Sequence, residues 1–509
     1  MEGTLHYNMK RIEINLVPDI VNPSPDYYCT WQTQLYATCD GKPASQRAIL
    51  GENALFSTEK PFGWAYFYEK ARGDLLFVMD DSWDVPLDGN PAHFGSLILN
   101  PEKFPQHTQG KNNAEALRSL VDTFQELGWK GLGGWVCAQE APIFSEFLPN
   151  ASCTQFPESY WKEKLSDMQA SGFSYWKVDW GKKGTNFVFR KMLTESAKQY
   201  APKLILEHAI TSDIIPHSDV FRTYDVPAIM SIPMTMQKIA DFSDIPAPAG
   251  ETLGLINCED EAYIAAAGGF TMGIMRHPYS GNFVNGAPDM SFPAIHRNLK
   301  TKMYEIIRAV RWHRIAPAFS FCSADLMVAD DTLCDTWRFE DVSAEIESWW
   351  LNMPLVADYM KDNVLRKEAP AAIARAASLP KIQADEYGNV PFCVVSQNPN
   401  GAFSVAALGR TIGRKYFIPK CDVTVDVKNA TTIGAFGEYK NLILNISPAS
   451  ITQVLMQDLT DNKAFDVTNL VTITGNQIVI PGELISRIGT CTQPAEDTSE
   501  PGVVIQLYK

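Results

Sequence analysis

The chain has 509 residues, of which 45% are hydrophobic and 20% charged, as is typical of a globular protein. Lys and Arg total 44 against 59 Asp and Glu, and the net charge of −15 argues against nucleic acid as a partner. No run of 18 apolar residues occurs, so the sequence predicts no membrane span.

The cysteine and histidine content limits which cofactors the protein could bind. The ten cysteines show no Cys-x-x-Cys spacing and no ligand-like His or Cys cluster occurs, so we expect no metal or organic cofactor. The acidic charge is compatible with a neutral substrate such as a sugar. The first twenty residues contain no apolar segment typical of a signal peptide. The protein could therefore be cytoplasmic, or it could be exported with its signal peptide removed. The sequence does not indicate an oligomeric state.

Apolar strands alternate with helical segments in the first three fifths of the chain. Residues 4–16 alternate as a strand, and residues 1–26 are expected to form an N-terminal strand segment. From about residue 27 to 320, helical stretches such as AEALRSLVDTFQELG separate short buried strands, among them YYCTW, DLLFVMDD, WKGLGGWVC, FSYWKVDW, PKLILEHAI and VFRTYDV. This alternation predicts a parallel (β/α)8 TIM barrel over residues 27–385. A doubly wound sheet is the alternative, weakened because no Gly-rich phosphate loop follows a strand.

The pattern changes toward the C-terminus. Residues 301–315 are expected to form a helix, and residues 335–375 an irregular helical extension of the barrel. From about residue 390, short strands such as AFSVAALG, CDVTVDV and NLILNI are separated by Gly, Asn and Pro turns. This pattern predicts an antiparallel β-sandwich domain over residues 386–509.

Acidic residues end several of the expected barrel strands. Active sites of such barrels lie at the carboxyl ends of the strands, where the sequence places Asp80, Asp81, Asp179, Glu207 and Asp225. Five carboxyl groups at one mouth are unfavourable unless cations or ligands offset them, which indicates a functional site. Each acid could instead cap a helix or hold a loop.

A cation accompanies two of these acids. Lys177 lies two residues before Asp179, so strand alternation directs both side chains to the same face, and the cation favours an ionised Asp179. Arg222 lies three residues before Asp225. Retaining glycosidases need an ionised nucleophile and a proton donor about 5–5.5 Å apart. Strand alternation alone would not direct Arg222 and Asp225 to the same face, so the loop geometry would have to do so.

Several segments, taken in order, resemble the α-galactosidases of glycoside hydrolase family 27 and their clan relatives. The likeness runs from about Trp31 to Pro278 and is most specific in FVMDDSWDVPLDGNPAHFGSLILNPEKFP. ELGWKGLGGW, FSYWKVDW, LILEHAI, FRTYDV and LINCEDEAYIAAAGG follow in family order. The resemblance implies a barrel followed by a sandwich and a retaining hydrolase for terminal α-D-galactosides. A β-L-arabinopyranosidase, an α-N-acetylgalactosaminidase or a non-catalytic sugar-binding barrel are the alternatives.

The resemblance also implies residue roles. Asp179 would be the nucleophile and Asp225 the acid/base, with a carbohydrate substrate bound by the following residues: Trp31, Asp80, Asp81, Trp135, Lys177, Glu207, His208 and Arg222. Asp80 and Asp81 would accept hydrogen bonds from the 4- and 6-hydroxyls of galactose. Trp31 would form an apolar wall under the sugar.

The residues expected around the sugar's 2-position, and the spacing of the expected acid/base, depart from the family pattern. Glu207 and Ile210 resemble the residues that favour a 2-hydroxyl over an N-acetyl group, but His208 stands where the family has Trp. The family spaces its Arg and acid/base Asp by four residues, against three here. Asp219 and Asp241 therefore remain alternatives to Asp225.

Overall fold

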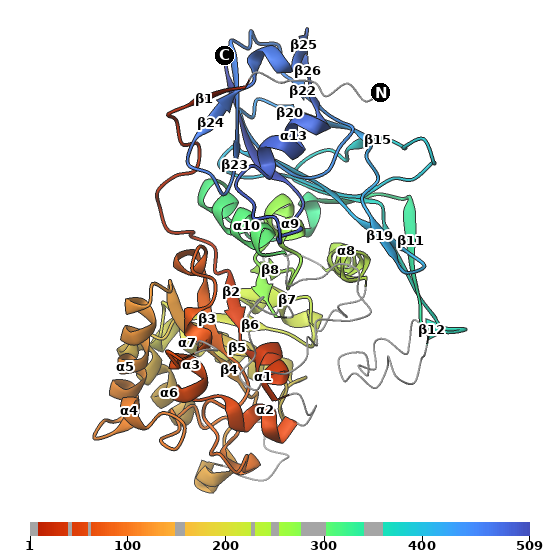
Figure 1. Ribbon diagram of the computed structural model, residues 1–509. Helices are drawn as coiled ribbons and strands as arrows, with labels where there is room; N and C mark the ends of the chain where they lie inside the picture. Colours follow the sequence, from red (N-terminus) through yellow and green to blue (C-terminus); the bar gives the residue numbers. More distant parts are fainter. Residues whose placement is uncertain are drawn as a thin grey trace.

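A parallel barrel and a β-sandwich pack against each other in the structure, which is a computed structural model. It describes residues 9–38, 43–59, 63–147, 158–224, 230–245, 254–275, 302–340 and 360–509. In Figure 1 the barrel lies below, in red to yellow, and the sandwich lies above, in blue. None of the helices in these ranges is long and apolar enough to cross a membrane.

Eight parallel strands form the barrel. Their order in the sheet is β8-β7-β6-β5-β4-β3-β2-β9, and a bridge between Asn257 and Thr271 brings β8 and β9 together. The strands are β2 (Tyr27–Cys29), β3 (Leu76–Met79), β4 (Gly131–Val136), β5 (Tyr175–Val178), β6 (Ile205–His208), β7 (Val220–Arg222), β8 (Leu255–Asn257) and β9 (Gly273–Ile274). The (β/α)8 barrel expected from the sequence is confirmed.

Helices surround the barrel and connect its strands. Helix α5 illustrates how the local sequence forms these helices. Asn112 and Glu115 form a capping box at its start, and its buried residues recur three and four apart. Between β6 and β7 the connection is a 3-10 segment, Ser212–His217. The helices are α1 (Trp31–Thr38), α2 (Pro43–Ile49), α3 (Glu52–Phe56), α4 (Pro105–Thr108), α5 (Asn113–Glu126), α6 (Glu158–Ser171), α7 (Phe187–Tyr200), α8 (Ser231–Asp241), α9 (Ala262–Gly268) and α10 (Met303–Ile315).

Two glycines of β4 explain how its neighbours pack so closely. A Cβ atom on Gly133 would lie 2.6 Å from the Cβ of Tyr175, inside the barrel wall. A Cβ on Gly134 would lie 2.7 Å from Nε1 of Trp83. The glycine pair in WKGLGGW therefore makes room for large aromatic side chains on both faces of this strand.

The larger sheet of the sandwich has nine strands. Most pairs are antiparallel, but β14 with β16 and β17 with β21 are parallel, so the sandwich is mixed rather than wholly antiparallel. Its order is β1 (Lys10–Ile12), β24 (Ala464–Asp466), β23 (Gln453–Asp458), β27 (Gly502–Tyr508), β21 (Thr432–Gly437), β17 (Phe403–Leu408), β16 (Phe392–Gln397), β14 (Ala372–Arg375) and β10 (Leu326–Val328).

A five-stranded sheet covers one face of the larger sheet. Apolar side chains of both sheets, together with helix α13 (Gly482–Gly489), form one buried core. The parallel pair β20–β22 is again an exception to antiparallel order. The strands are, in sheet order, β15 (Lys381–Gln383), β20 (Asp422–Lys428), β22 (Asn441–Ile446), β26 (Gln477–Pro481) and β25 (Thr472–Thr474).

The region expected to be a helical extension is β-structure wherever the structure describes it. β11 (Thr332–Arg338) pairs with β13 (Val364–Pro370) over seven residues, and β12 (Met360–Lys361) extends this small sheet. Residues 341–359 lie outside the described residues. The helical expectation over 335–375 is wrong because long-range strand pairing, which local spacing does not reveal, overrides propensity. A hairpin of β18 (Arg410–Ile412) and β19 (Lys415–Phe417) lies nearby.

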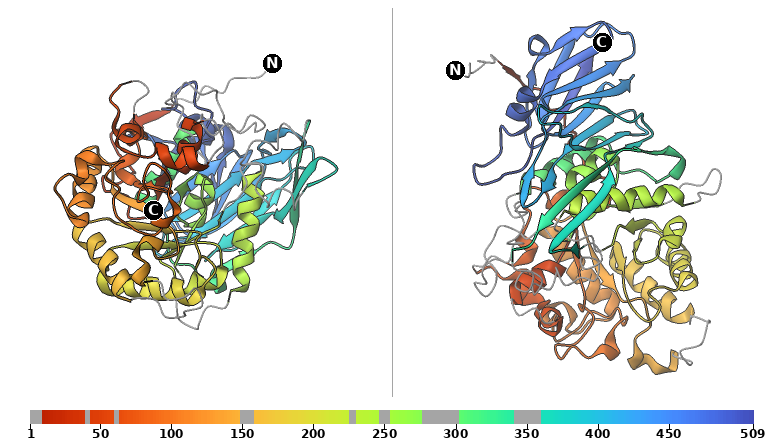
Figure 2. Two further views of the ribbon diagram at one scale, coloured as in Figure 1. Left: turned by 90° about the horizontal axis from the view of Figure 1, so that it is seen from below. Right: turned by 90° about the vertical axis from the view of Figure 1, so that its right-hand side faces the viewer.

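The sandwich begins earlier than residue 386. β10 and β14 precede that position but belong to its large sheet, and β1, from the expected separate N-terminal segment, pairs with β24. Figure 2 shows the two parts stacked, with α9 and α10 between them. The rings of Tyr263 and Phe436 lie 5.0 Å apart across this junction, and the buried core runs continuously through it.

Candidate active site

The interior of the barrel carries polar side chains in register. Trp135, Lys177 and Glu207 are direct neighbours on β4, β5 and β6, and Arg222 is the neighbour of Asn257 on β7 and β8. Because alternate residues of a strand share a face, Asp179 points into the barrel one layer above Lys177, nearer the mouth. The expected residues of β4, β5 and β7 are therefore brought together.

Asp179 follows the last residue of β5 and is held by two donors. Trp135 Nε1 donates to Oδ2 at 3.0 Å, and Arg222 Nη2 donates to Oδ1 at 3.3 Å. Its side chain is 13% exposed, whereas that of Arg222 is 1% exposed. The carboxylate thus has a fixed orientation and remains accessible from the mouth.

The surroundings of Asp179 favour its ionised form. Burial raises the pKa of this carboxyl, but Arg222, Lys177 and the Trp135 hydrogen bond together outweigh burial and leave the pKa below its ordinary value. A carboxylate that stays charged in an enclosed site is suited to act as a nucleophile or to stabilise a cation.

Lys177 forms a buried ion pair with Asp80. Its Nζ lies 2.6 Å from Asp80 Oδ2, and the thiol of Cys29 donates to the same oxygen at 2.9 Å. Burial lowers the pKa of Lys177, but Asp80 outweighs this and raises it, so Lys177 carries a positive charge. Lys177 therefore contacts Asp80 directly and acts on Asp179 through its charge.

Asp81 is held by a cation from outside the strands. Arg47 of α2 lies 2.9 Å from Asp81 Oδ2, and Ser82 Oγ donates to Oδ1 at 2.5 Å. Burial raises the pKa of Asp81, with Arg47 and Ser82 acting in the opposite direction. Both members of the Asp80–Asp81 pair are therefore enclosed and oriented by specific partners.

Glu207 is enclosed in the barrel interior. Its side chain is fully buried one layer below Asp179 and accepts hydrogen bonds from three neutral side chains: Tyr27 at 3.0 Å, Tyr175 at 2.9 Å and Asn257 at 2.6 Å. Arg222 Nε lies 3.5 Å away. The strand register places this carboxylate beneath Arg222, and the contact between Glu207 and the sugar's 2-position stays a prediction.

His208 also differs from its expected role as a substrate contact. It alternates with Glu207 and therefore faces α7, where Arg190 Nη1 donates to its Nδ1 at 3.1 Å. Its Nε2 lies 2.7 Å from Thr194 Oγ1, so Nε2 carries the proton of the neutral ring. Burial and Arg190 hold the pKa of His208 well below its ordinary value. His208 braces Arg190, which in turn donates to the backbone oxygen of Asp179 at 2.7 Å.

Arg222 links three carboxylates of the described residues. Besides Asp179 and Glu207, it approaches Glu259, whose Oε1 lies 3.7 Å from Nη1. Glu259 follows β8 and is a further acid at the carboxyl end of a strand. The same strand-end rule that selected Asp179 would have selected Glu259 from LINCEDEA.

Aromatic rings line one side of the mouth beside Asp179. Trp180 is 39% exposed and lies 5.4 Å from the Trp135 ring and 5.3 Å from Phe94. Arg47 lies 5.0 Å above the Phe94 ring. Trp31, the first residue of α1, is half-buried and packs on the apolar side chains inside the barrel. The aromatic character of Trp180 and Phe94 was present in the sequence, but their convergence depends on loop geometry.

The structure describes two of the three acid/base candidates, Asp219 and Asp241. Asp225 lies outside the described residues. Asp219 stands at the amino end of β7 and accepts from the Leu206 amide at 3.0 Å, so it lies at the opposite end of the barrel from Asp179. Asp241 is the last residue of α8, ten residues after the helix begins at Ser231. Asp219 therefore does not lie at the mouth.

Unusual backbone conformations gather at the same end of the barrel. Ser82, Ile210, Tyr224 and Glu259 have φ values of 81°, 78°, 60° and 49°, and each follows a different barrel strand. Positive φ is unfavourable for residues with a side chain and is often found at functional sites. Within the described residues, His, Cys, Asp and Glu form no group suited to hold a metal ion.

Comparison with known proteins gives similarity of architecture at low identity. No family model and no curated protein sequence matches this chain. A GH27 β-L-arabinopyranosidase from Geobacillus stearothermophilus is 11% identical over 96% of this chain and 95% of its own, with a TM-score of 0.38. An α-galactosidase from Saccharomyces cerevisiae, solved with raffinose, is 9% identical (96% and 97% covered, TM-score 0.34). An α-amylase from Geobacillus thermoleovorans is 8% identical (96% and 100% covered, TM-score 0.41). Similarities this low assign no residue roles, which therefore depend on the site geometry.

Proposed function

We propose that this protein is a retaining exo-glycoside hydrolase that releases terminal α-D-galactose, or a closely related sugar, by double displacement. The state of Asp179 is the observation that best supports this. It is accessible from the mouth, oriented by Trp135 and Arg222, and surrounded by charges that favour its ionised form. A carboxylate nucleophile needs these three properties together.

The proposed reaction has two steps. Asp179 attacks the anomeric carbon, the glycosidic C–O bond breaks, and the leaving oxygen takes a proton from the acid/base. Water then gives a proton to that same group and attacks the glycosyl ester, which releases Asp179 and restores the original anomeric configuration. We assign the acid/base to Asp225, and Glu259 is the alternative because it shares Arg222 with Asp179.

Substrate contacts are proposed for the residues around the mouth. Asp80 and Asp81 would accept hydrogen bonds from vicinal sugar hydroxyls, since charged acceptors strengthen such bonds. Trp31 and Trp180 would supply apolar contact area. β-L-Arabinopyranosides and α-N-acetylgalactosaminides remain alternative substrates, and the assignment of Glu207 to the 2-position stays a prediction.

Hydrolysis of nitrophenyl glycosides tests the activity. We expect turnover of nitrophenyl α-galactoside, with α-galactose as the first anomer detected by NMR, and no turnover by Asp179→Ala with an unchanged melting temperature. The panel includes the β-L-arabinopyranoside and the α-N-acetylgalactosaminide. Inactivity of the folded wild type on the whole panel would favour a non-catalytic sugar-binding barrel.

Chemical rescue separates the two acid/base candidates. If Asp225 is the acid/base, Asp225→Ala should slow substrates with basic leaving groups far more than activated ones, and azide should restore turnover by attacking the glycosyl-enzyme. Glu259→Gln is the matched variant. Azide rescue of Glu259→Gln but not of Asp225→Ala would move the assignment to Glu259.

A further inference from the structure

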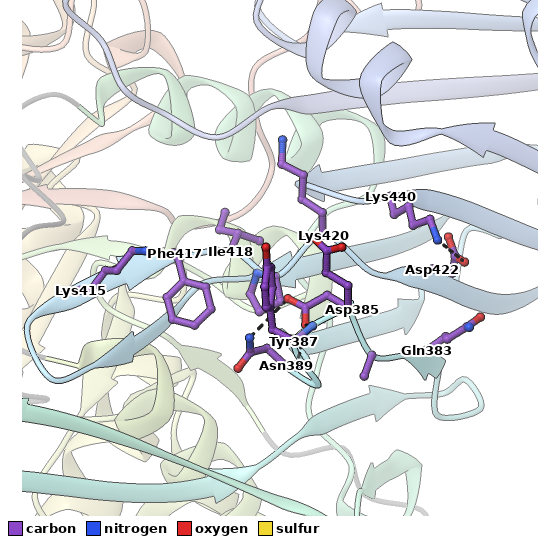
Figure 3. A pocket seen from close by; sticks show the side chains of 13 residues that line it. Gln383, Asp385, Tyr387, Asn389, Lys415, Phe417, Ile418, Lys420, Asp422 and Lys440 are labelled. Atoms are coloured by element: carbon purple, nitrogen blue, oxygen red, sulfur yellow. Dashed lines mark hydrogen bonds and ion pairs between the residues drawn. The ribbon is translucent and has the colours of Figure 1, made fainter. Parts of the chain in front are cut away.

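The sandwich contains a cavity of about 760 Å³ that is separate from the barrel. Every residue lining it lies between residues 383 and 440: at the end of β15, in the turn after it, in β19 and the loop that follows, at the start of β20, and directly before β22. Figure 3 shows these side chains around the opening, with Tyr387 near the centre. The proposed glycosidase mechanism uses none of them.

The turn between β15 and β16 holds Tyr387 in a fixed position. The Asp385 carboxylate accepts hydrogen bonds from the amides of Tyr387 at 2.9 Å and Asn389 at 2.8 Å. The Gly388 amide donates to the Asp385 carbonyl at 3.0 Å, with Gly388 at φ 79°. Aspartate and glycine at these positions favour a tight, well-defined turn. The backbone of Tyr387 is therefore held in place, and its side chain is exposed.

The exposure of Tyr387 is unusual for an aromatic residue. It is 81% exposed, the largest fraction among the exposed large hydrophobic residues in the described ranges. Leaving so much apolar ring in water is unfavourable, because burial of a Tyr ring would stabilise the fold. A ring presented to solvent by an ordered turn at the edge of a cavity is instead suited to cover the face of a ligand.

The charges around the cavity balance. Three lysines and three carboxylates line it, and Lys440 lies 3.8 Å from Asp422 while Lys420 pairs with Glu438 at 2.6 Å outside the lining. A site for a phosphate or another anion would have an excess of cations. Amide groups of Asn389 and Gln383 add donors and acceptors that suit hydroxyl groups.

We propose that this cavity is a second carbohydrate-binding site, in which Tyr387 stacks on a pyranose ring of a neutral oligosaccharide or polysaccharide. A pyranose has an apolar C–H face and a rim of hydroxyls. The electron-rich face of an aromatic ring attracts polarised C–H groups, and the surrounding amides and carboxylates match the rim. The pre-organised turn lowers the entropy lost on binding. Such a site would hold a polymer near the protein without taking part in bond cleavage.

Affinity electrophoresis of the full-length chain tests this site. The probe is a soluble galactomannan cast into the native gel, and all proteins carry Asp179→Asn so that the polymer stays intact. We expect Tyr387→Ala to weaken retardation roughly tenfold, and Tyr387→Phe to retain it because the ring remains. Tyr508→Ala is the matched control, since Tyr508 is an exposed aromatic on the same sandwich but outside the cavity.

The outcomes separate this site from the proposed activity. Tyr387→Ala in the otherwise wild-type chain should hydrolyse nitrophenyl α-galactoside at the wild-type rate, because a small aryl glycoside needs only the barrel. The electrophoresis result stands even if the protein shows no glycosidase activity. Equal retardation of Tyr387→Ala and its parent, no retardation of the parent, or retardation only by anionic polygalacturonate would overturn the proposal.

Discussion

Replacing Trp135 by Phe isolates one interaction that keeps Asp179 ionised. Phenylalanine keeps an apolar ring beside Phe94 but removes the Nε1 donor that lies 3.0 Å from Asp179 Oδ2. Burial raises the pKa of Asp179, and the Trp135 hydrogen bond is among the interactions that lower it. We therefore expect the pKa of Asp179 to rise in Trp135→Phe.

The size of the rise follows from the strength of the lost bond. A hydrogen bond to a charged group contributes about 1.5–3 kcal/mol, and one pKa unit corresponds to about 1.36 kcal/mol. Arg222 and Lys177 remain in place, and water can replace part of the bond because Asp179 is 13% exposed. The expected rise is therefore about one pKa unit, at the lower end of this range.

The pH dependence of kcat/KM on nitrophenyl α-galactoside measures this rise. The ionised nucleophile is needed, so activity falls as the pH drops through the pKa of Asp179 and the acid limb should move upward in Trp135→Phe. Trp180→Phe is the control, because its ring packs on Trp135 at 5.4 Å without donating to Asp179 in any described hydrogen bond. An acid limb unchanged in Trp135→Phe, or equally shifted in both variants, would refute the reasoning.

Two further substitutions test buried carboxylates. Glu207→Gln should lower kcat/KM on the α-galactoside and the α-N-acetylgalactosaminide by the same factor if Glu207 acts by orienting Arg222, which lies 3.5 Å away. A change in the ratio of the two kcat/KM values beyond about tenfold would instead show that Glu207 reads the 2-position. Burial raises the pKa of Asp84 from its ordinary value to about 6, so protonation favours the folded state. The protonated carboxyl adds on the order of 3 kcal/mol to the free energy of unfolding below about pH 4, and this stabilisation is lost as the pH rises through 6. Chemical denaturation at pH 4 and 7 should therefore show a smaller loss of stability for Asp84→Asn than for the wild type, and equal losses would contradict this.

Much of the barrel could be predicted from local patterns because each buried strand and helix carries its own signature. The strand-end rule placed Asp80, Lys177 and Asp179 in one interior, where the structure also has them. It did not reveal which layer Glu207 occupies, since the register between neighbouring strands decides that, and the role that the resemblance implied for His208 did not anticipate its contacts with α7. That register depends on contacts with residues 30 to 180 positions away, such as Tyr175 and Tyr27.

The sandwich was harder to predict at its boundaries. β1 joins β24 across more than 450 residues of chain, and β11 pairs with β13 through a long connection. Local spacing contains no record of such partners, so Lys10–Ile12 was expected to belong to a separate segment and Val364–Pro370 to a helix. Long-range pairing decided both.

Trapping the covalent intermediate tests the central claim most directly. A 2-deoxy-2-fluoro-α-galactosyl fluoride slows the second displacement more than the first, so a retaining enzyme accumulates its glycosyl ester. Peptide mass spectrometry of the inactivated full-length protein should place the fluorosugar on Asp179. A label on Asp80, Asp81 or Glu259, or full turnover by Asp179→Ala, would contradict the assignment of Asp179 as the nucleophile.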